Sequence, residues 1–463
     1  MFFDTVQNAT PVLLIGGLLI ILSVVIRWSK NQHSGLFNFK KDLTEASEKS
    51  PKIPKIADDK TLIGISQNKK SVFIPNNAKH VFLCGTTGSG KTVALSNFIK
   101  SGIDNGYPLL IIDGKGDTGK GSILDIVTQM KGNKKAYIIN LNDPEGSDHY
   151  NPFKGTSADI IKDMLINMTN WTEEHYKYNT ERYLQRLIWL MELSGVTVSL
   201  ESLINLLPTE EFTVLSKRLV EKNLLTKEEH IKNMEIAKIS GPIAGSAAAR
   251  FSTIAESRLG KIFNENGVDI YTALEENAII LFILNPLMYP EMSPLIGRLV
   301  VIDSKKAVSK FYQNKKNRTF YIFDEINTYI SNAMVDLVNK SRSANITCVL
   351  ATQSLSDLNN IEGSDFLESV IENCNNYLVL RQNSPTNAEA WAKIIGTRKT
   401  MNATYQVKGA DSGELSPTDL GTLRQTWEFV YHPNVIKNLA TGEAIFITKD
   451  LKYHAKIKVN KPL

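Results

Sequence analysis

The feature that most constrains this chain is the stretch CGTTGSGKT at residues 84–92, which has the pattern G-x-x-x-x-G-K-[ST]. An apolar run, His80–Cys84, leads into it, and a helical pattern over Val93–Ser101 follows. Glycines let the backbone curl so that successive N–H groups point inward, and the dipole of the following helix favours an anion. A strand, this loop and a helix in that order predict a cradle for the phosphates of a nucleotide. The alternative is a chance glycine-rich turn.

The residue types in the loop predict separate roles. Lys91 is placed to reach the β- and γ-phosphates, and the Thr92 hydroxyl to ligate Mg²⁺. ATP and Mg²⁺ are therefore the expected cofactors. The predicted nucleotide contacts are Gly85, Thr86, Thr87, Gly88, Ser89, Gly90, Lys91 and Thr92.

Hydrolysis also needs a carboxylate near Mg²⁺ and a group that orients water. The segment RTFYIFDE, Arg318–Glu325, is an apolar strand pattern that ends in two carboxylates. Ligands bind at the carboxyl ends of strands in open α/β sheets. We therefore expect Asp324 to hold Mg²⁺ through water and Glu325 to polarise the attacking water. The alternative is a solvated strand end.

Two further polar residues are candidates for the same site. Gln353 ends another apolar strand pattern, from which it can sense the γ-phosphate; the alternative is a helix start capped by Ser354. Arg342 is a candidate to complete a neighbouring subunit's site by stabilising charge on the transferring phosphoryl group. The alternatives are a surface arginine at a helix end, and Arg381 in the same role. The predicted catalytic residues are Glu325, Gln353 and Arg342.

Composition sets broad limits. The chain has 463 residues, 42% of them hydrophobic and 22% charged, which is typical of a globular protein of two or three domains. The net charge of +5 permits a polyanionic partner without arguing for one. The three cysteines have neither metal-site nor disulfide spacing, so we expect buried thiols in a reducing compartment.

The N-terminal region predicts a membrane anchor. Pro11–Ile26 contains no charge, and with its neighbours it reaches the length of about 20 residues that crosses a bilayer. Asp4 precedes the run while Arg27 and Lys30 follow it, which favours an uncleaved span with the bulk of the chain in the cytoplasm. The lysine-rich stretch that follows, up to residue 60, is either a tether that touches anionic lipid or a solvated linker.

Downstream of this region the pattern is α/β. Near-continuous apolar runs alternate with helical patterns, which indicates a mostly parallel sheet covered on both faces. The expected strands are His80–Cys84, Pro108–Ile112, Ala136–Ile139, Ala278–Leu284, Thr319–Phe323, Thr347–Ala351 and Tyr377–Leu380.

Residues 157–246 show no strand pattern, so they predict an all-α subdomain inserted into the nucleotide-binding domain. Helices are expected over Asn179–Leu193, after Ser199 and after Thr226, where TKEE forms a capping box. Gly241–Ser246 is the expected hinge back to the core. The predicted organisation is an anchor (1–30), a polar linker (31–60), the nucleotide-binding domain (61–156 and 247–463), the all-α subdomain (157–246), and a C-terminal hairpin of Ala444–Lys449 and Lys452–Val459 that closes the sheet edge.

Taken together, these motifs resemble the type IV coupling proteins of bacterial conjugation. The resemblance rests on the phosphate loop, the DGKGD turn, YNPF, the IFDEIN strand end, LATQSLSDL and GEA near the C-terminus. It covers nearly the whole chain from Phe73 onward, and the layout of anchor, core and insert is similar too.

The resemblance implies a RecA-like P-loop NTPase core that works as a membrane-bound homo-hexamer. Such a motor would engage a relaxase–DNA complex and feed DNA into a type IV secretion channel by ATP hydrolysis. By position it implies nucleotide and Mg²⁺ binding by Lys91 and Thr92, and a hydrolytic pair of Asp324 and Glu325. It also implies phosphate sensing by Gln353 and a trans-acting role for Arg342.

The chain departs from the family pattern in having one expected span instead of two, a small insert and no acidic C-terminal extension. Two other functions share the same core. One is an ATPase that recruits protein effectors for type IV secretion, which DNA-independent hydrolysis would indicate. The other is an FtsK-like DNA translocase, although that family carries several spans, a long linker and a winged-helix tail.

Overall fold

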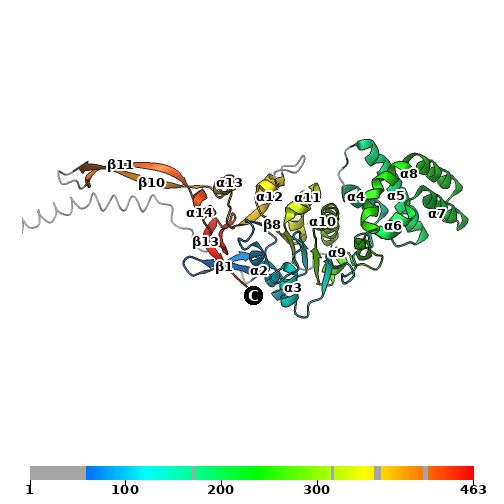
Figure 1. The fold of residues 1–463 in the computed structure, drawn as a ribbon, viewed down its shortest axis with the longest axis horizontal. Coiled ribbons are helices and arrows are strands. Elements are labelled where there is room, and N and C mark those ends of the chain that lie inside the picture. Colours follow the sequence, from blue (N-terminus) through cyan, green and yellow to red (C-terminus); the bar gives the residue numbers. More distant parts are fainter. Residues whose placement is uncertain are drawn as a thin grey trace, which may run out of the picture. The chain divides into compact units, whose positions relative to one another are not determined.

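The computed structural model describes residues 59–168, 171, 173–313, 318–358, 366–409 and 415–462 (Figure 1). The expected membrane anchor and nearly all of the polar linker lie outside these residues. In the described part of the chain, no helix is both long and apolar enough to span a membrane. Contacts divide the chain into two units, one containing Lys52–Ala388 with Pro433–Leu463 and the other containing Glu389–His432.

An eleven-stranded sheet forms the centre of the larger unit, in the order β2-β1-β13-β12-β9-β3-β8-β7-β4-β6-β5. All seven strands expected from the sequence are confirmed, each within a few residues of its predicted bounds. They pair in parallel because their helical connections return the chain to the same edge. These strands are β3 (His80–Cys84), β4 (Leu109–Asp113), β5 (Ala136–Asn140), β6 (Ile279–Ile283), β7 (Thr319–Asp324), β8 (Ile346–Thr352) and β9 (Cys374–Val379).

Helices pack on the parallel strands and bury them. On one face, α2 (Lys91–Asp104) and α3 (Ile123–Met130) join alternate strand residues in a single hydrophobic core. The remaining core helices are α9 (Ile270–Glu275), α10 (Met292–Phe311), α11 (Asn332–Ser341) and α12 (Phe366–Asn373). Every residue of β3, β4, β6, β7 and β8 is buried, which explains why these strands read as continuous apolar runs.

Four antiparallel strands extend the sheet beyond β9. The expected C-terminal hairpin is present as β12 (Glu443–Thr448) and β13 (Tyr453–Val459). The expectation that it closes the sheet edge is wrong. β13 pairs on its far side with β1 (Lys60–Ser66), and β2 (Ser71–Pro75) forms the edge. No strand was predicted before residue 80, because these two strands are short and fewer than half of their residues are buried.

Residues 158–255 contain helices and no described strand. The helices are α4 (Ala158–Met168), α5 (Glu174–Ser194), α6 (Leu200–Leu206), α7 (Thr209–Glu221) and α8 (Lys227–Ala255). Ser199 and Thr226 cap α6 and α8 as expected, each within a capping box. Two hydrogen bonds hold the chain just before this region. The Tyr150 hydroxyl donates to Asp303 of α10 at 2.9 Å, and the Asn151 side-chain amide donates to the Val198 carbonyl at 3.1 Å.

The expected hinge at Gly241–Ser246 is wrong, because α8 runs through it. Pro242 removes one backbone donor from the helix, but it does not end it. Packing decides the outcome here. Gly241 and Ala244 are buried, and a Cβ at Gly241 would lie 2.7 Å from the Thr209 hydroxyl. The glycine therefore serves close packing of α8 rather than a turn.

The smaller unit contains a long antiparallel ribbon that the sequence analysis did not predict. Its strands are β10 (Thr397–Gly409) and β11 (Leu415–Phe429), paired from Thr397↔Phe429 to Gly409↔Leu415 with one irregularity after Tyr405. The strands carry many threonines, amides and charges, so no alternation of apolar and polar residues marks them.

Candidate nucleotide site

The phosphate loop follows β3 and is hydrogen-bonded to the carboxyl ends of the two strands that flank it, β8 and β9. The Gly85 N–H donates at 3.2 Å to the carbonyl of Thr352, the last residue of β8, and the Thr86 N–H donates at 3.0 Å to the carbonyl of Arg381, just after β9. Gly88 and Gly90 have φ values of 74° and 107°, where a side chain is strained, and Gly90 is the N-cap of α2. The local sequence thus produces the strand–loop–helix unit that the motif requires.

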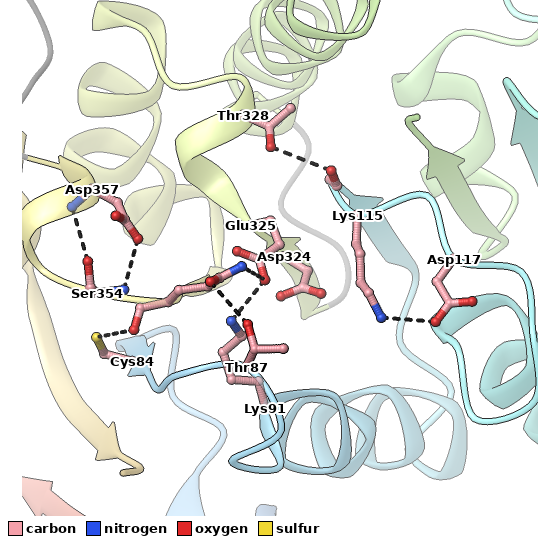
Figure 2. A network of polar contacts seen from close by, with 12 residues as sticks. Cys84, Thr87, Lys91, Lys115, Asp117, Asp324, Glu325, Thr328, Ser354 and Asp357 are labelled. Atoms are coloured by element: carbon pink, nitrogen blue, oxygen red, sulfur yellow. Dashed lines mark hydrogen bonds and ion pairs between the residues drawn. The ribbon is translucent and has the colours of Figure 1, made fainter. Parts of the chain in front are cut away.

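Four of the predicted site residues converge in one polar network (Figure 2). Lys91 Nζ lies 2.8 Å from Glu325 Oε1, and the Gln353 side-chain amide donates to the same oxygen at 3.1 Å. The Thr87 hydroxyl in turn donates to Gln353 Oε1 at 3.2 Å. Since Lys91 and Glu325 are both buried, their attraction is little screened by solvent. The network therefore ties the phosphate loop directly to the ends of β7 and β8.

The backbone at Glu325 is unusual, with φ 47° and ψ 53° in the left-handed region. Non-glycine residues adopt this conformation at a cost, and such positions cluster at functional sites. Gly114, after β4, approaches closely, because a Cβ there would lie 2.8 Å from the carbonyl oxygens of both Asp324 and Glu325. The turn after β7 therefore packs directly on the backbone of Gly114, and in this conformation the Glu325 side chain contacts Lys91.

Asp324 and Asp113 end adjacent parallel strands and lie in register. Burial, followed by the charges of Glu325 and Asp113, raises the pKa of Asp324 to about 7. Burial raises the pKa of Asp113 to about 6, although backbone N–H donors from Lys115 and Gly116 oppose this. Asp324 Oδ1 and Glu325 Oε2 have no hydrogen-bond partner among the described residues. Such carboxylate oxygens, together with the Thr92 hydroxyl in the wall of the same cavity, are of the chemical type that could hold Mg²⁺ and its water shell.

The DGKGD turn is part of this site, which the motif resemblance did not specify. The Asp113 carboxylate accepts from the Lys115 N–H at 2.9 Å and shapes the turn. Lys115 lines the same cavity as the phosphate loop, but its Nζ is paired with Asp117 at 2.9 Å and turns away from Lys91 (Figure 2). The sequence did contain a signal for this part of the site, because Asp113 ends β4, the strand that pairs with β7.

These elements enclose a cavity of about 530 Å³. It opens at a loop after β6 where Leu287 is 94% exposed. The lining residues of the phosphate loop are Thr86, Thr87, Gly88, Gly90, Lys91 and Thr92. Those from elsewhere include Lys115, Leu287, Asp324, Glu325, Gln353 and Thr441. Gly85 and Ser89 belong to the loop but do not line the cavity.

The segment after β8 contributes a cavity-lining side chain, and it also contains the cap that was the alternative for this segment. Gln353 faces the site, and the Ser354 hydroxyl accepts from the Asp357 N–H at 3.3 Å at the start of a short 3₁₀ turn. Arg342 is not brought to the site of its own chain. It is exposed and precedes the amino end of β8, whereas Gln353 follows the carboxyl end. Arg381 follows β9 and contributes its carbonyl to the loop, but it does not line the cavity either.

Comparison with known proteins adds the family. Residues 270–460 match the model of the type IV secretion-system coupling protein DNA-binding domain. The chain belongs to the type IV coupling-protein family. Two uncharacterised proteins of Mycoplasma pneumoniae are similar to shorter stretches. One is 28% identical over 101 residues, covering 22% of this chain and 67% of its own length; the other is 30% identical over 99 residues, covering 16% and 78%.

Solved coupling-protein structures share the fold. The unbound conjugative coupling protein TrwB aligns with a TM-score of 0.64 at 16% identity, over 88% of this chain and 90% of its own. TrwB in complex with ADP and Mg²⁺ aligns with a TM-score of 0.61 at 16% identity, over 92% of both chains. VirB4 of Thermoanaerobacter pseudethanolicus aligns with a TM-score of 0.56 at 12% identity, over 88% and 98%. The mostly parallel α/β sheet therefore resembles the RecA-like core of TrwB.

Proposed function

We propose that this coupling protein is an ATPase that moves DNA of a relaxase–DNA complex into a type IV secretion channel. The observation that carries the proposal is the Lys91–Glu325–Gln353 network at the carboxyl edge of the sheet, inside a cavity of nucleotide size. TrwB, which has the same fold, has been solved with nucleotide analogues and with ADP and Mg²⁺. The matched family model describes a DNA-binding domain, which supports DNA as the cargo.

The network suggests how the site is set for hydrolysis. Without nucleotide, Lys91 neutralises Glu325. A triphosphate in the loop competes for the Lys91 ammonium, and Glu325 then becomes free to accept a proton from the attacking water. Gln353 contacts both Glu325 and Thr87, so it couples the state of the phosphate site to the end of β8. Thr92 and, through water, Asp324 would hold Mg²⁺, which would supply charge stabilisation for the phosphates when bound.

Assembly and location belong to the same proposal. A homo-hexamer would let Arg342 of one subunit reach the site of the next, since it lies away from its own. The N-terminal span would hold the protein in the bacterial inner membrane with the ATPase core in the cytoplasm. Secretion-channel components would be its partners there.

The test is ATP hydrolysis by the full chain in detergent, with no DNA, single-stranded DNA or double-stranded DNA. Severalfold stimulation by DNA supports the motor, and the preferred form identifies its track. Hydrolysis that ignores both DNA forms at concentrations that permit rings would favour secretion of protein effectors instead. The Glu325→Gln variant provides the blank for contaminating ATPases.

A further inference from the structure

A turn near the C-terminus, Ala440–Glu443, lies against the phosphate loop. The Gly442 N–H donates to the Ser89 carbonyl at 2.9 Å, and the Thr441 hydroxyl donates to the Gly88 carbonyl at 3.2 Å. A Cβ on Gly90 would lie 3.4 Å from Gly442 Cα. Thr441 is also exposed in the wall of the nucleotide cavity. We infer that Thr441 is a positioning residue for nucleotide binding, a role that rests on the proposed ATPase function.

The two hydrogen bonds act on the part of the loop whose orientation decides phosphate binding. In a planar trans peptide the carbonyl and the next N–H point in opposite directions. Holding the Ser89 carbonyl therefore directs the Gly90 N–H to the other side of that peptide. Holding the Gly88 carbonyl in the same way directs the Ser89 N–H to Thr86, to which it donates at 3.1 Å. Thr441 and Gly442 thus fix two consecutive peptide planes of the loop.

The turn itself is held by the sheet, so it can act as a rigid support. Its ends are joined by a Glu443 N–H to Ala440 carbonyl bond of 2.9 Å, and the Glu443 carboxylate accepts from the Ala440 N–H at 2.9 Å. Lys456 of β13 pairs with Glu443 at 2.9 Å. Gly442, with φ 80°, takes a conformation that strains other residues, and its carbonyl accepts from the Val459 N–H at 2.8 Å.

These contacts hold the backbone of the phosphate loop in one conformation before nucleotide binds. Without the Thr441 hydroxyl, the Gly88–Ser89 peptide gains freedom that binding must then remove. One neutral hydrogen bond is worth about 1 kcal/mol, which corresponds to roughly a fivefold change in affinity. The chemical step, which depends on Glu325 and the metal, should change little.

The experiment compares Thr441→Val with Thr441→Ser in the full-length protein. Valine keeps the shape and removes the donor, while serine keeps the donor. Binding of a fluorescent ADP analogue and steady-state ATP hydrolysis are measured for both. We expect Thr441→Val to raise the nucleotide Kd and the KM for ATP about fivefold with kcat within twofold, and Thr441→Ser to restore both.

A matched control is Thr128→Val on α3. Thr128 is also exposed and also donates to a backbone carbonyl, that of Leu124 at 2.8 Å, but it does not line the cavity. Unchanged Kd and KM in Thr441→Val, or equal effects of the two valine variants, would overturn the inference. So would a fall in kcat at unchanged Kd. If wild-type protein bound no nucleotide, the proposed function and this inference would fall together; nucleotide binding without DNA stimulation would leave the inference standing.

Discussion

At the scale of single residues, the Lys91–Glu325 pair links the phosphate loop to the carboxylate that we propose as the general base. Both side chains are buried, and each meets the charge of the other. Breaking such a pair by removing one partner leaves an uncompensated buried charge. In the proposed function a phosphate would take the place of the carboxylate beside Lys91, so nucleotide binding would release Glu325.

This pairing predicts opposite effects for its two members. Glu325→Gln should bind ATP at least as tightly as wild type, because Lys91 no longer has a competing carboxylate. Its kcat should fall by about 10²-fold or more, since a general base is lost. Lys91→Met should lose nucleotide binding. Fluorescent-nucleotide titration and phosphate release measure both, and turnover of Glu325→Gln within tenfold of wild type would contradict the assignment.

His80 gives a prediction about pH and stability. Burial, helped by the charge of nearby Arg342, lowers the pKa of His80 to about 4, while its ring nitrogen Nδ1 accepts from the Cys348 N–H at 3.0 Å. The unfolded chain, with an ordinary histidine pKa of about 6.5, binds more protons between these values. Stability from neutral His80 is therefore complete above pH 6.5 and is lost as the pH falls toward 4.

Between pH 7 and pH 5 this group should cost about 2 kcal/mol of the free energy of unfolding. His80→Asn keeps an acceptor but does not titrate, so its loss over the same interval should be smaller by that amount. Urea unfolding at both pH values provides the measurement. Equal losses in the two proteins would show that His80 is not held neutral.

At the scale of elements, α8 shows tertiary packing overriding local preference. A sequence of glycine, proline and small residues predicts a break, yet the helix continues because one of its glycines lies against α7. Gly241 and Gly245 are in the same helix with different surroundings. A Cβ at Gly241 would meet Thr209 at 2.7 Å, whereas nothing lies within 4 Å of one at Gly245.

Alanine at these two positions should therefore have different effects. Gly245→Ala should stabilise the protein by about 0.5–1 kcal/mol, because alanine loses less backbone entropy in a helix. Gly241→Ala should lack this gain or destabilise, since the new methyl group crowds Thr209. Thermal unfolding of the two variants gives the comparison. A gain of the same size at both positions would mean that Gly241 is not a packing contact.

Elements marked by a pattern in their own sequence could be predicted, whereas elements that depend on contacts with distant residues could not. The seven parallel strands each contain a run of mostly apolar residues, and the glycine loop specifies its own geometry, so both could be located from sequence. β10 and β11 are stabilised by pairing with each other along long polar strands, which leaves no apolar period. Thr441 contacts Gly88 across 353 residues, and no local pattern records such a contact.

At the scale of the whole molecule, the sheet depends on its last strand. The seven-residue β13 pairs with both β1 and β12, and therefore joins the N-terminal strands to the rest. Deleting residues 453–463 should leave β12 unpaired on one side and abolish soluble expression or nucleotide binding. The deletion removes no residue of the phosphate loop, so a loss of nucleotide binding would have to result from disruption of the sheet.

Removal of the ribbon is the matched comparison. Thr397 and Phe429 are cross-strand partners, so a two-residue Asn-Gly turn can join the chain there in place of residues 398–428. Although this removes far more chain, nucleotide affinity should stay within twofold of wild type, because the ribbon pairs within itself. Gel filtration and fluorescent-nucleotide titration measure both deletions, and a greater loss from the ribbon deletion would contradict this division of the molecule.

The residues that precede and follow the ribbon in sequence both contact the phosphate loop. Arg381, before it, accepts a hydrogen bond from Thr86, and Gly442, after it, donates one to Ser89. Two residues that are 61 positions apart in sequence are therefore hydrogen-bonded to the same short loop. A change in the backbone of that loop on nucleotide binding would be met both by the residue that follows β9 and by the turn that precedes β12, whereas the ribbon between them in sequence pairs within itself.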